Sequence, residues 1–372
     1  MTTVAKGLEG VVAATSAISA IENGMLTYRG IDIDVLAERS NFEEVVYLLW
    51  HGRLPKASEL EALRSALIEA AGVPEDVLAV LRRAPQNTHP MTVLRTAISA
   101  LALYDAEAED MSEAANIRKA VRLVAKTPTL VAAWQRIRSG EEPVAPRSNG
   151  SIAESFLTML HGREPDPTHV EALDKAFILH ADHEFNASTF AARVTVGTLS
   201  DMYSGVVAAL GALKGPLHGG ANEQVMAMLE EIGAPDRVEA YIRGKLERKE
   251  RIMGFGHRVY KDGDPRAKHL REMSRRLTES IGESKWYAMS VAIERLVGEL
   301  KGLKPNVDFY SASVYHSLGI PRDLFTPIFA ISRMAGWTAH ILEQYSDNRL
   351  IRPRAEYVGP SNVPYVPIEA RG

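Results

Sequence analysis

The segment Asn186–Leu213, NASTFAARVTVGTLSDMYSGVVAALGAL, says more about the fold than any other stretch of the sequence. It is rich in Ala, Ser, Thr and Gly and carries few charges, so a helix over 187–213 has no hydrophilic face. Such a helix is usually buried, and its small side chains let neighbouring backbones approach closely. The segment predicts a central helix of a large bundle or a helix at a dimer interface, and we favour both together.

Helical periodicity also dominates the rest of the chain. Apolar residues in 42–49 and 225–232 recur at i, i+3, i+4 and i+7, which indicates one buried helix face in each. Further helices are expected over 57–71, 75–83, 90–104, 112–138, 151–160, 167–180, 236–248, 265–281, 284–300, 306–317 and 322–345. Only 18–21 and 25–28, which flank Asn23-Gly24, predict a β-hairpin. The predicted fold class is mainly α with a short N-terminal hairpin.

The composition excludes several kinds of site. The 372 residues carry 43 Lys+Arg and 47 Asp+Glu, and the net charge of −4 argues against general nucleic-acid binding. The absence of cysteine excludes disulfides, thiolate zinc sites, iron–sulfur clusters and a cysteine nucleophile. No apolar run approaches the roughly 18 residues of a membrane span, so we expect a cytoplasmic protein without a membrane partner.

The first candidate for chemistry is His218, in the segment 214–223, KGPLHGGANE. It precedes an expected helix, whose positive N-terminal end opposes imidazolium and favours a neutral ring that donates one hydrogen bond. The adjacent glycines let the backbone come close to a ligand. The alternative is a histidine in a glycine-rich turn without a chemical role.

The second candidate is His257, in the segment 253–266, MGFGHRVYKDGDPR. Glycines, aromatics and cations crowd together there without hydrophobic periodicity. Lys261 and Arg266 suit a phosphate or a carboxylate, Arg through its planar fork and Lys as a point charge. The alternative is a solvated basic loop.

Asp308, in the segment 304–311, KPNVDFYS, opens an expected helix. It is either an acid favoured by the helix dipole or a carboxylate in a partly apolar pocket, with a raised pKa suited to proton abstraction. The segment 180–186, HADHEFN, is either a hydrogen-bonding loop or a metal site. Near the C-terminus, 348–354, NRLIRPR, is either an exposed basic tail or a tail that reaches a second subunit.

Together these motifs resemble the citrate synthase family. LHGGANE (217–223), GFGHRVYKDGDPR (254–266) and PNVDFYS (305–311) occur in the order that this family has. HADHEFNAST, SRMAGW and RPRAEY resemble its other signature segments, and GLEGVVA, TYRG and VVYLLWHGRLP look like its short bacterial and archaeal type. The resemblance covers essentially the whole chain.

The resemblance implies a mainly α homodimer with two domains in each subunit. The large helical domain would comprise 1–220 and 318–372, with the C-terminal tail reaching the partner subunit. The small helical domain would be 221–317, and the active site would lie in the cleft between the two.

The implied reaction condenses acetyl-CoA with oxaloacetate and hydrolyses the thioester to citrate and CoA, the entry step of the tricarboxylic acid cycle. Carried over motif by motif, Asp308 would be the base, His218 would stabilise the enol or enolate, and His257 would protonate the oxaloacetate carbonyl oxygen. The implied oxaloacetate residues are His183, Asn186, Arg266, Arg333 and, from the other subunit, Arg352, while Ser188 would orient His218. The implied CoA residues are Lys261, Arg354, Asn306, Gly254, Phe255 and Gly256.

No metal or other cofactor is expected, because acetyl-CoA is a substrate. The nearest alternative is a 2-methylcitrate synthase that uses propionyl-CoA, since the space for one methylene is worth only ~1–3 kcal/mol. A distant alternative is a helical metal-dependent hydrolase with His180, Asp182 and His183 as ligands, and another is a helical scaffold without catalysis.

Overall fold

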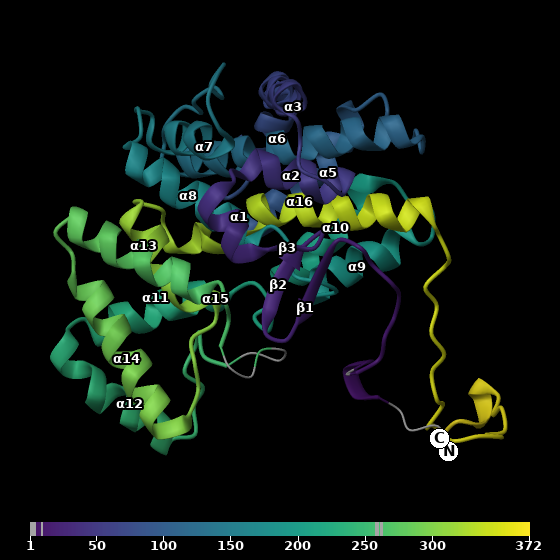
Figure 1. Cartoon of the computed structure of the whole chain (residues 1–372). Coiled ribbons are helices and arrows are strands. Elements are labelled where there is room, and N and C mark those ends of the chain that lie inside the picture. The colour runs from purple at the N-terminus through teal and green to yellow at the C-terminus, as the bar shows by residue number, and fades with distance from the viewer. Residues whose placement is uncertain (1–4, 9, 257–259, 261–262) are drawn as a thin grey trace.

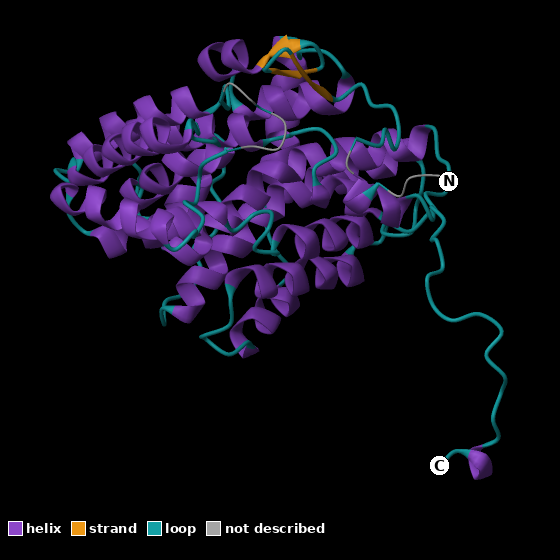
Figure 2. Cartoon of the chain, turned by 90° about the horizontal axis from the view of Figure 1, so that it is seen from below, coloured by secondary structure: helices purple, strands orange, loops and turns teal. Residues whose placement is uncertain are grey.

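The computed structural model describes residues 5–8, 10–256, 260 and 263–372, and helices form most of it (Figures 1 and 2). Three short strands, β1 (Ser19–Glu22), β2 (Met25–Tyr28) and β3 (Ile31–Asp32), form one sheet. The α-helices are α1 (Ile33–Arg39), α2 (Phe42–His51), α3 (Ala57–Ala70), α4 (Glu75–Arg83), α5 (Pro90–Leu101), α6 (Glu113–Arg138), α7 (Ile152–His161), α8 (Pro167–His180), α9 (Ala187–Val196), α10 (Met202–Leu213), α11 (Ala221–Ile232), α12 (Val238–Glu247), α13 (Ala267–Ser280), α14 (Lys285–Lys301), α15 (Val307–Ser317) and α16 (Phe325–Ser346). The mainly α fold class is confirmed.

The predicted β-hairpin is also confirmed. Strands β1 and β2 pair antiparallel with Ser19 opposite Tyr28. Asn23 and Gly24 both have positive φ, 51° and 78°, which is the backbone conformation that an Asn-Gly hairpin turn requires. The structure adds β3, a two-residue strand that pairs with β2 and was not predicted.

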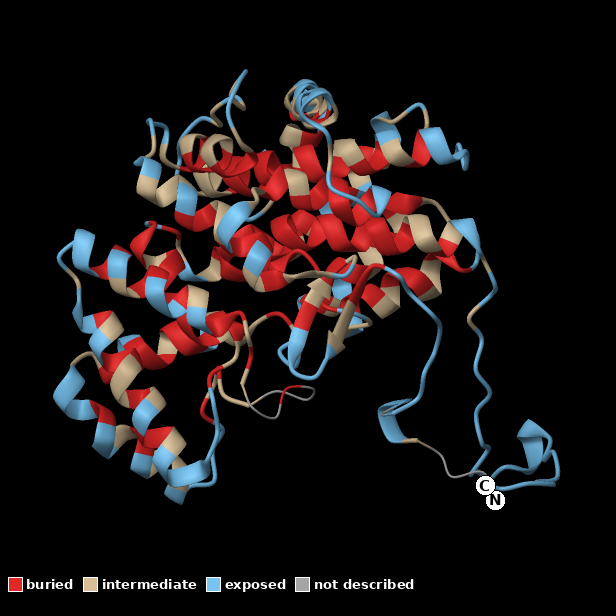
Figure 3. Cartoon of the chain, viewed as in Figure 1, coloured by how far each residue is buried: buried red, intermediate tan, exposed pale blue. Residues whose placement is uncertain are grey.

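Helix α16 is the centre of the core (Figures 1 and 3). Every residue from Phe325 to Ile341 is buried, because α2, α6, α8, α9 and α10 all pack against this helix. An apolar helix without a hydrophilic face needs neighbours all round, and α16 has them. Neither α16 nor any other helix in the described part of the chain is long and apolar enough to cross a membrane.

The prediction of one helix over 187–213 is wrong, because the segment forms two helices, α9 and α10, that pack against each other. Leu199 between them has a φ of +65°, which no right-handed helix accommodates. Asp201 then starts α10, because its carboxylate accepts a hydrogen bond from the Ser204 N–H at 3.0 Å. The many small, uncharged residues around it concealed this capping signal.

Helices α9 and α10 are not fully buried within one chain, although the sequence predicted a buried segment. Their inner faces pack on α16, but Phe190, Val194 and Val207 remain half-buried and Leu199 is exposed. The outward side therefore consists of small and apolar residues.

Helices α11–α15 lie together at one side of the molecule (Figure 1). Within this group α13 packs on α15, α11 on α15, and α12 on α14, while α13 and α15 also touch α8. The predicted boundaries at 220 and 317 coincide with the start of α11 and the end of α15. The division into two domains remains a prediction.

Candidate active site

His218 lies in the turn between α10 and α11, where its N–H donates to the Gly215 carbonyl at 2.9 Å. Its ring Nε2 accepts a hydrogen bond from the Ser188 N–H at 3.3 Å, so the ring proton is assigned to Nδ1. Burial, with the charge of Arg333 as a second cause, lowers the pKa of His218 to about 4. A neutral ring was predicted from the helix terminus, and here burial is the main cause of the neutral state.

Ser188, in the first turn of α9, holds the His218 ring in place. Its hydroxyl lies 2.8 Å from His218 Nε2 and 2.7 Å from the Asn186 Oδ1. Trp337 on α16 donates its indole N–H to the same hydroxyl at 3.1 Å. The histidine is therefore tied to the central helix through one serine.

Asp308 occupies the first turn of α15, where its N–H donates to the Asn306 Oδ1 at 3.1 Å. The Oδ1 atom of Asp308 is buried and has no hydrogen-bond partner among the described residues. Burial raises the pKa of Asp308 to about 7, although the positive charges of Arg266 and Arg333 act against the shift. A carboxyl group with this pKa can exchange a proton near neutral pH.

Arg266 and Asp264 form a buried pair beside Asp308. The guanidinium donates to both carboxylate oxygens, at 2.9 Å from Nε and 2.7 Å from Nη2. Burial disfavours the charged guanidinium of Arg266. The negative charge of Asp264 and its hydrogen bonds together have the larger effect, and they raise the pKa of Arg266. Asp264 also accepts the Val307 N–H at 3.0 Å, so it joins Arg266 to the start of α15.

Arg333 on α16 is the second buried cation. Its Nε donates to the His180 carbonyl at 2.7 Å, and its guanidinium carbon lies 4.6 Å from the centre of the Phe329 ring. Burial lowers the pKa of Arg333 to about 10, and its Nη1 has no partner among the described residues. The charge of Arg333 acts on the pKa of both His218 and Asp308, so Arg333 lies near both groups.

The turn between α8 and α9 carries His183 and Asn186. The His183 Nε2 lies 3.0 Å from the Tyr260 hydroxyl. Asn186 uses its side chain as the cap of α9: its Oδ1 accepts the Thr189 N–H at 3.1 Å, and its amide donates to the His183 carbonyl. In this structure Asn186 positions Ser188 and the turn.

The close approach of α16 to this turn depends on a glycine. The Gly336 N–H donates to the Ala181 carbonyl at 3.1 Å, and a Cβ at Gly336 would collide with that carbonyl and with Asp182. This explains the glycine of the SRMAGW motif.

Two predicted CoA segments lie side by side. Gly256 N–H donates to the Lys304 carbonyl at 3.0 Å, Asn306 N–H donates to the Gly254 carbonyl at 2.9 Å, and Phe255 pairs with Pro305. The Asn306 amide also donates to the Gly256 carbonyl at 3.0 Å. Gly254 has a φ of 80° and is packed against Phe309, so a side chain there would be strained.

His257 and Lys261 lie outside the described residues. Arg352 and Arg354 are exposed on the extended segment after α16, which runs away from the helices (Figure 2). Within one chain the structure does not bring these two arginines to the other site residues.

The residues of the metal-hydrolase alternative have separate partners. His180 Nδ1 donates to the Ala176 carbonyl at 2.8 Å, Asp182 is 3.2 Å from His340, and His183 contacts Tyr260. Among the described residues no three His, Asp or Glu side chains are grouped as metal ligands.

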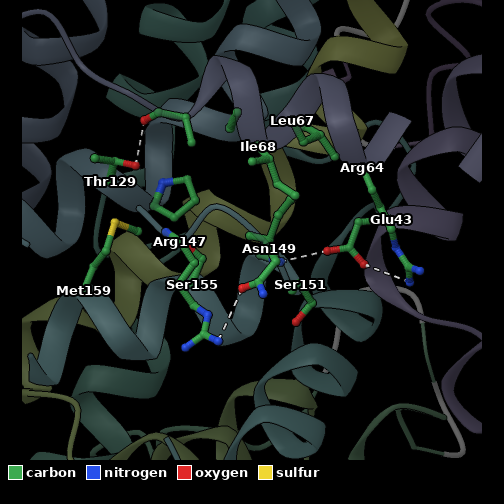
Figure 4. Close-up of a pocket in the computed structure, with 15 residues that line it drawn as sticks. Glu43, Arg64, Leu67, Ile68, Thr129, Arg147, Asn149, Ser151, Ser155 and Met159 are labelled. Carbon is green, nitrogen blue, oxygen red and sulfur yellow. Dashed lines mark hydrogen bonds and ion pairs between the residues drawn. The ribbon is translucent and has the colours of Figure 1, made fainter. Parts of the chain in front are cut away.

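A hollow between α2, α3, α6 and α7 contains none of the predicted residues (Figure 4). Glu43 is buried on its wall, where Oε1 accepts the Ile152 N–H at 2.8 Å and Oε2 lies 3.9 Å from Arg64. Burial raises the pKa of Glu43, and the nearby Asp174 is affected in the same direction.

Sequence reasoning missed Asp264, Tyr260, Phe329 and Trp337 as parts of the site. Phe329 and Trp337 lie four residues before and after Arg333, so helical spacing around that arginine could have indicated both. Asp264 and Tyr260 belong to the same loop as Arg266, but nothing local to that loop shows which distant groups they meet.

Comparisons with known proteins agree with this geometry. A family model described as citrate synthase, C-terminal domain, matches residues 7–354. The chain is 64% identical over 370 residues to citrate synthase 2 of Bacillus subtilis. The aligned region covers 99% of this chain and 100% of that relative. The chain belongs to the citrate synthase family. It is accordingly an enzyme of the acyltransferase class.

Two further relatives of this citrate synthase family member are informative. The 2-methylcitrate synthase of Shewanella oneidensis is 45% identical and covers 98% of this chain and 97% of that relative. A solved ternary complex of citrate synthase from Thermoplasma acidophilum with carboxymethyl coenzyme A and oxaloacetate is 36% identical, with a TM-score of 0.94 over 99% of this chain and 100% of that one.

Proposed function

We propose that this protein condenses acetyl-CoA with oxaloacetate and hydrolyses the resulting thioester to citrate and CoA. One observation carries the proposal: burial raises the pKa of the Asp308 carboxyl group near two buried arginines, and one of these, Arg333, also acts on the neutral His218. The relative from Thermoplasma acidophilum binds oxaloacetate and a CoA derivative, which supports the choice of substrates.

In the proposed first step, the Asp308 carboxylate takes a proton from the acetyl methyl group. The thioester oxygen then gains negative charge, and His218 stabilises it by donating a hydrogen bond from Nδ1. Ser188 supports this role, because its N–H binds Nε2 and leaves the ring proton on Nδ1. A thioester α-proton is a weak acid, so the base and the donor must act together.

In the second step, the enolate carbon attacks the oxaloacetate carbonyl carbon, and His257 gives a proton to the carbonyl oxygen. The two carboxylates of oxaloacetate require cations, and Arg333 has an unpartnered Nη1 in the described part of the structure. Arg266 and His183 would complete the site, with Arg352 from the other subunit. Water then cleaves the thioester, which releases citrate and the CoA thiol.

The joined segments at Gly254–Gly256 and Asn306 would bind CoA through backbone and amide groups, and Lys261 and Arg354 would contact its phosphates. Because these segments lie on the side of α11–α15, closure toward α16 would bring CoA to oxaloacetate and exclude water until condensation. We expect oxaloacetate to bind first, so acetyl-CoA should bind more tightly in its presence. Equal affinity with and without oxaloacetate would contradict this order.

We also propose that the active form is a homodimer. The outward side of α9 and α10 is uncharged, and the exposed tail beyond α16 borders a hollow of about 810 Å³ with residues 11–17. A second subunit would cover this surface and receive Arg352. If so, mixing inactive Arg352→Ala and Asp308→Asn proteins under exchange conditions should restore activity, because mixed dimers contain one complete site. Absence of recovery in dimers shown to have exchanged would contradict a shared site.

The test of the reaction is a thiol-release assay with oxaloacetate and each acyl-CoA. We expect CoA release from acetyl-CoA and the same activity after treatment with a chelator. A higher kcat/KM for propionyl-CoA would make the protein a 2-methylcitrate synthase, as its relatives of that name allow. No CoA release from either thioester would overturn the proposal.

A further inference from the structure

The turn Ala181–Asn186 is fixed from several directions. The Tyr28 hydroxyl donates a hydrogen bond to the Asp182 carbonyl at 3.0 Å. The Asp182 carboxylate accepts a hydrogen bond from the Ser19 hydroxyl and lies 3.2 Å from His340 Nε2. Asn186 closes the other end as the cap of α9. The backbone on both sides of His183 is therefore held by residues of β1, β2, α9 and α16.

The ring of His183 contacts Tyr260, which comes from a distant part of the chain. Tyr260 lies in the segment between α12 and α13, and its hydroxyl is 3.0 Å from His183 Nε2. The two rings meet edge-on, with centroids 5.5 Å apart and planes at 71°. Both side chains are buried, at 5% exposed for Tyr260 and 9% for His183, so water competes little for this hydrogen bond.

The same segment is anchored near the turn at a second point. Arg266 reaches the Leu179 carbonyl through Nη1 at 3.5 Å and is fixed by Asp264. Tyr260 thus approaches His183 from a loop whose end is docked on α8. This contact joins the α11–α15 side of the molecule to the turn that would hold oxaloacetate.

We propose that Tyr260 is a positioning residue for oxaloacetate, acting through His183. The tyrosine hydroxyl donates to Nε2, which places the proton of the neutral imidazole on the other ring nitrogen and fixes the ring plane. His183 then presents a hydrogen-bond donor in one orientation to an anionic substrate. This inference rests on the proposed function, because it assumes that His183 binds oxaloacetate.

One observation supports the proposed direction of this hydrogen bond. Burial raises the pKa of Tyr260, so its hydroxyl keeps its proton throughout the working pH range and can donate it to Nε2.

The first test compares Tyr260→Phe with the unaltered protein by calorimetric titration of oxaloacetate and by steady-state kinetics. Loss of one neutral hydrogen bond should weaken oxaloacetate binding about fivefold. The kcat, the KM for acetyl-CoA and the thermal unfolding temperature should stay close to their original values. Tyr241→Phe is the control, because Tyr241 donates to Glu231 on a distant surface and should change none of these quantities.

The second test is a double-mutant cycle with His183→Ala. If Tyr260 acts through His183, Tyr260→Phe should have no further effect on oxaloacetate binding in the His183→Ala protein. Equal affinity of Tyr260→Phe and the original protein, or an undiminished effect without His183, would overturn the inference. Failure of the original protein to bind oxaloacetate at all would instead overturn the proposed function.

Discussion

Asp182 is buried and Asp308 is half-buried, and the pKa values of their carboxyl groups are shifted in opposite directions. Asp182 accepts a hydrogen bond from Ser19 and lies 3.2 Å from His340 Nε2. Burial alone would raise the pKa of Asp182, but His340 and these hydrogen bonds outweigh it and lower the pKa. For Asp308 burial prevails, because only the charges of Arg266 and Arg333 act against it and no hydrogen bond to its carboxyl group lowers the pKa.

The difference indicates a supporting role for Asp182 and is consistent with the proposed chemical role of Asp308. The partners of Asp182 keep it ionised, and it joins the β1 strand to α16 through Ser19 and His340. Asp308 lacks such donors, so its proton is gained and lost near neutral pH. If the two roles are separate, substitutions at Asp308 and at Asp182 should change different properties of the protein.

The largest expected effect is on catalysis. Asp308→Asn should lower kcat about 10³-fold, because an amide cannot take the methyl proton. The thermal unfolding temperature should not fall, since the amide replaces a buried carboxyl oxygen without a partner. Thiol release and thermal unfolding measured on one preparation check both. Retained turnover would remove Asp308 from its proposed role.

Asp182→Asn should show the opposite pattern. The free energy of unfolding should fall by about 3 kcal/mol, because a buried ionic partner of His340 is removed. Urea unfolding of the two variants side by side measures this. An Asp182→Asn protein as stable as the original, but inactive, would mean that Asp182 takes part in the chemistry instead.

A smaller effect is expected at the support of His218. Ser188→Ala should lower kcat about tenfold, because His218 loses the hydroxyl contact while the Ser188 backbone N–H remains. The KM for oxaloacetate should change little. Ser280→Ala is the matched control, since that hydroxyl only bonds the Leu277 carbonyl at the end of α13. A similar loss in both variants would refute a specific role for Ser188.

The smallest effect concerns pH. With a pKa of about 7, Asp308 becomes protonated as pH falls, so kcat/KM for acetyl-CoA should fall about fourfold between pH 8 and 6.5. A flat profile over this range, with binding and folding unchanged, would contradict a base with this pKa.

The contributions of the two aspartates to the free energy of unfolding should change with pH in opposite directions. Asp308 has a raised pKa in the folded state, so its contribution is present below pH ~4 and is lost as pH rises toward 7. Asp182 has a lowered pKa, so its contribution is present above pH ~4 and is lost as pH falls. Urea unfolding from pH 2 to 8 of each Asn variant, compared with the original protein, should show the Asp182 contribution falling below pH ~4 and the Asp308 contribution falling between pH ~4 and 7.

Much of the fold was predictable because helix limits are encoded locally. Ser112, Asp166 and Asn306 each cap a helix with their own side chain, and the predicted limits of α6, α8 and α15 are correct to one residue. The break between α9 and α10 was missed because the residues from Gly197 to Ser200 are as small and uncharged as much of the flanking helices. Within the site, motif order indicated His218 and Asp308 before any geometry was known.

The amino-acid sequence by itself determined the helical class and the hairpin turn at Asn23-Gly24, because these depend on neighbours a few positions away, and its ordered motifs indicated the candidate catalytic residues. The tertiary structure alone decided the protonation states of His218 and Asp308 and the partners of Arg266 and His183. Those properties depend on burial and on groups brought from distant segments, such as Trp337 on α16 behind Ser188 and Tyr260 beside His183. A sequence lists such groups without stating which of them will meet.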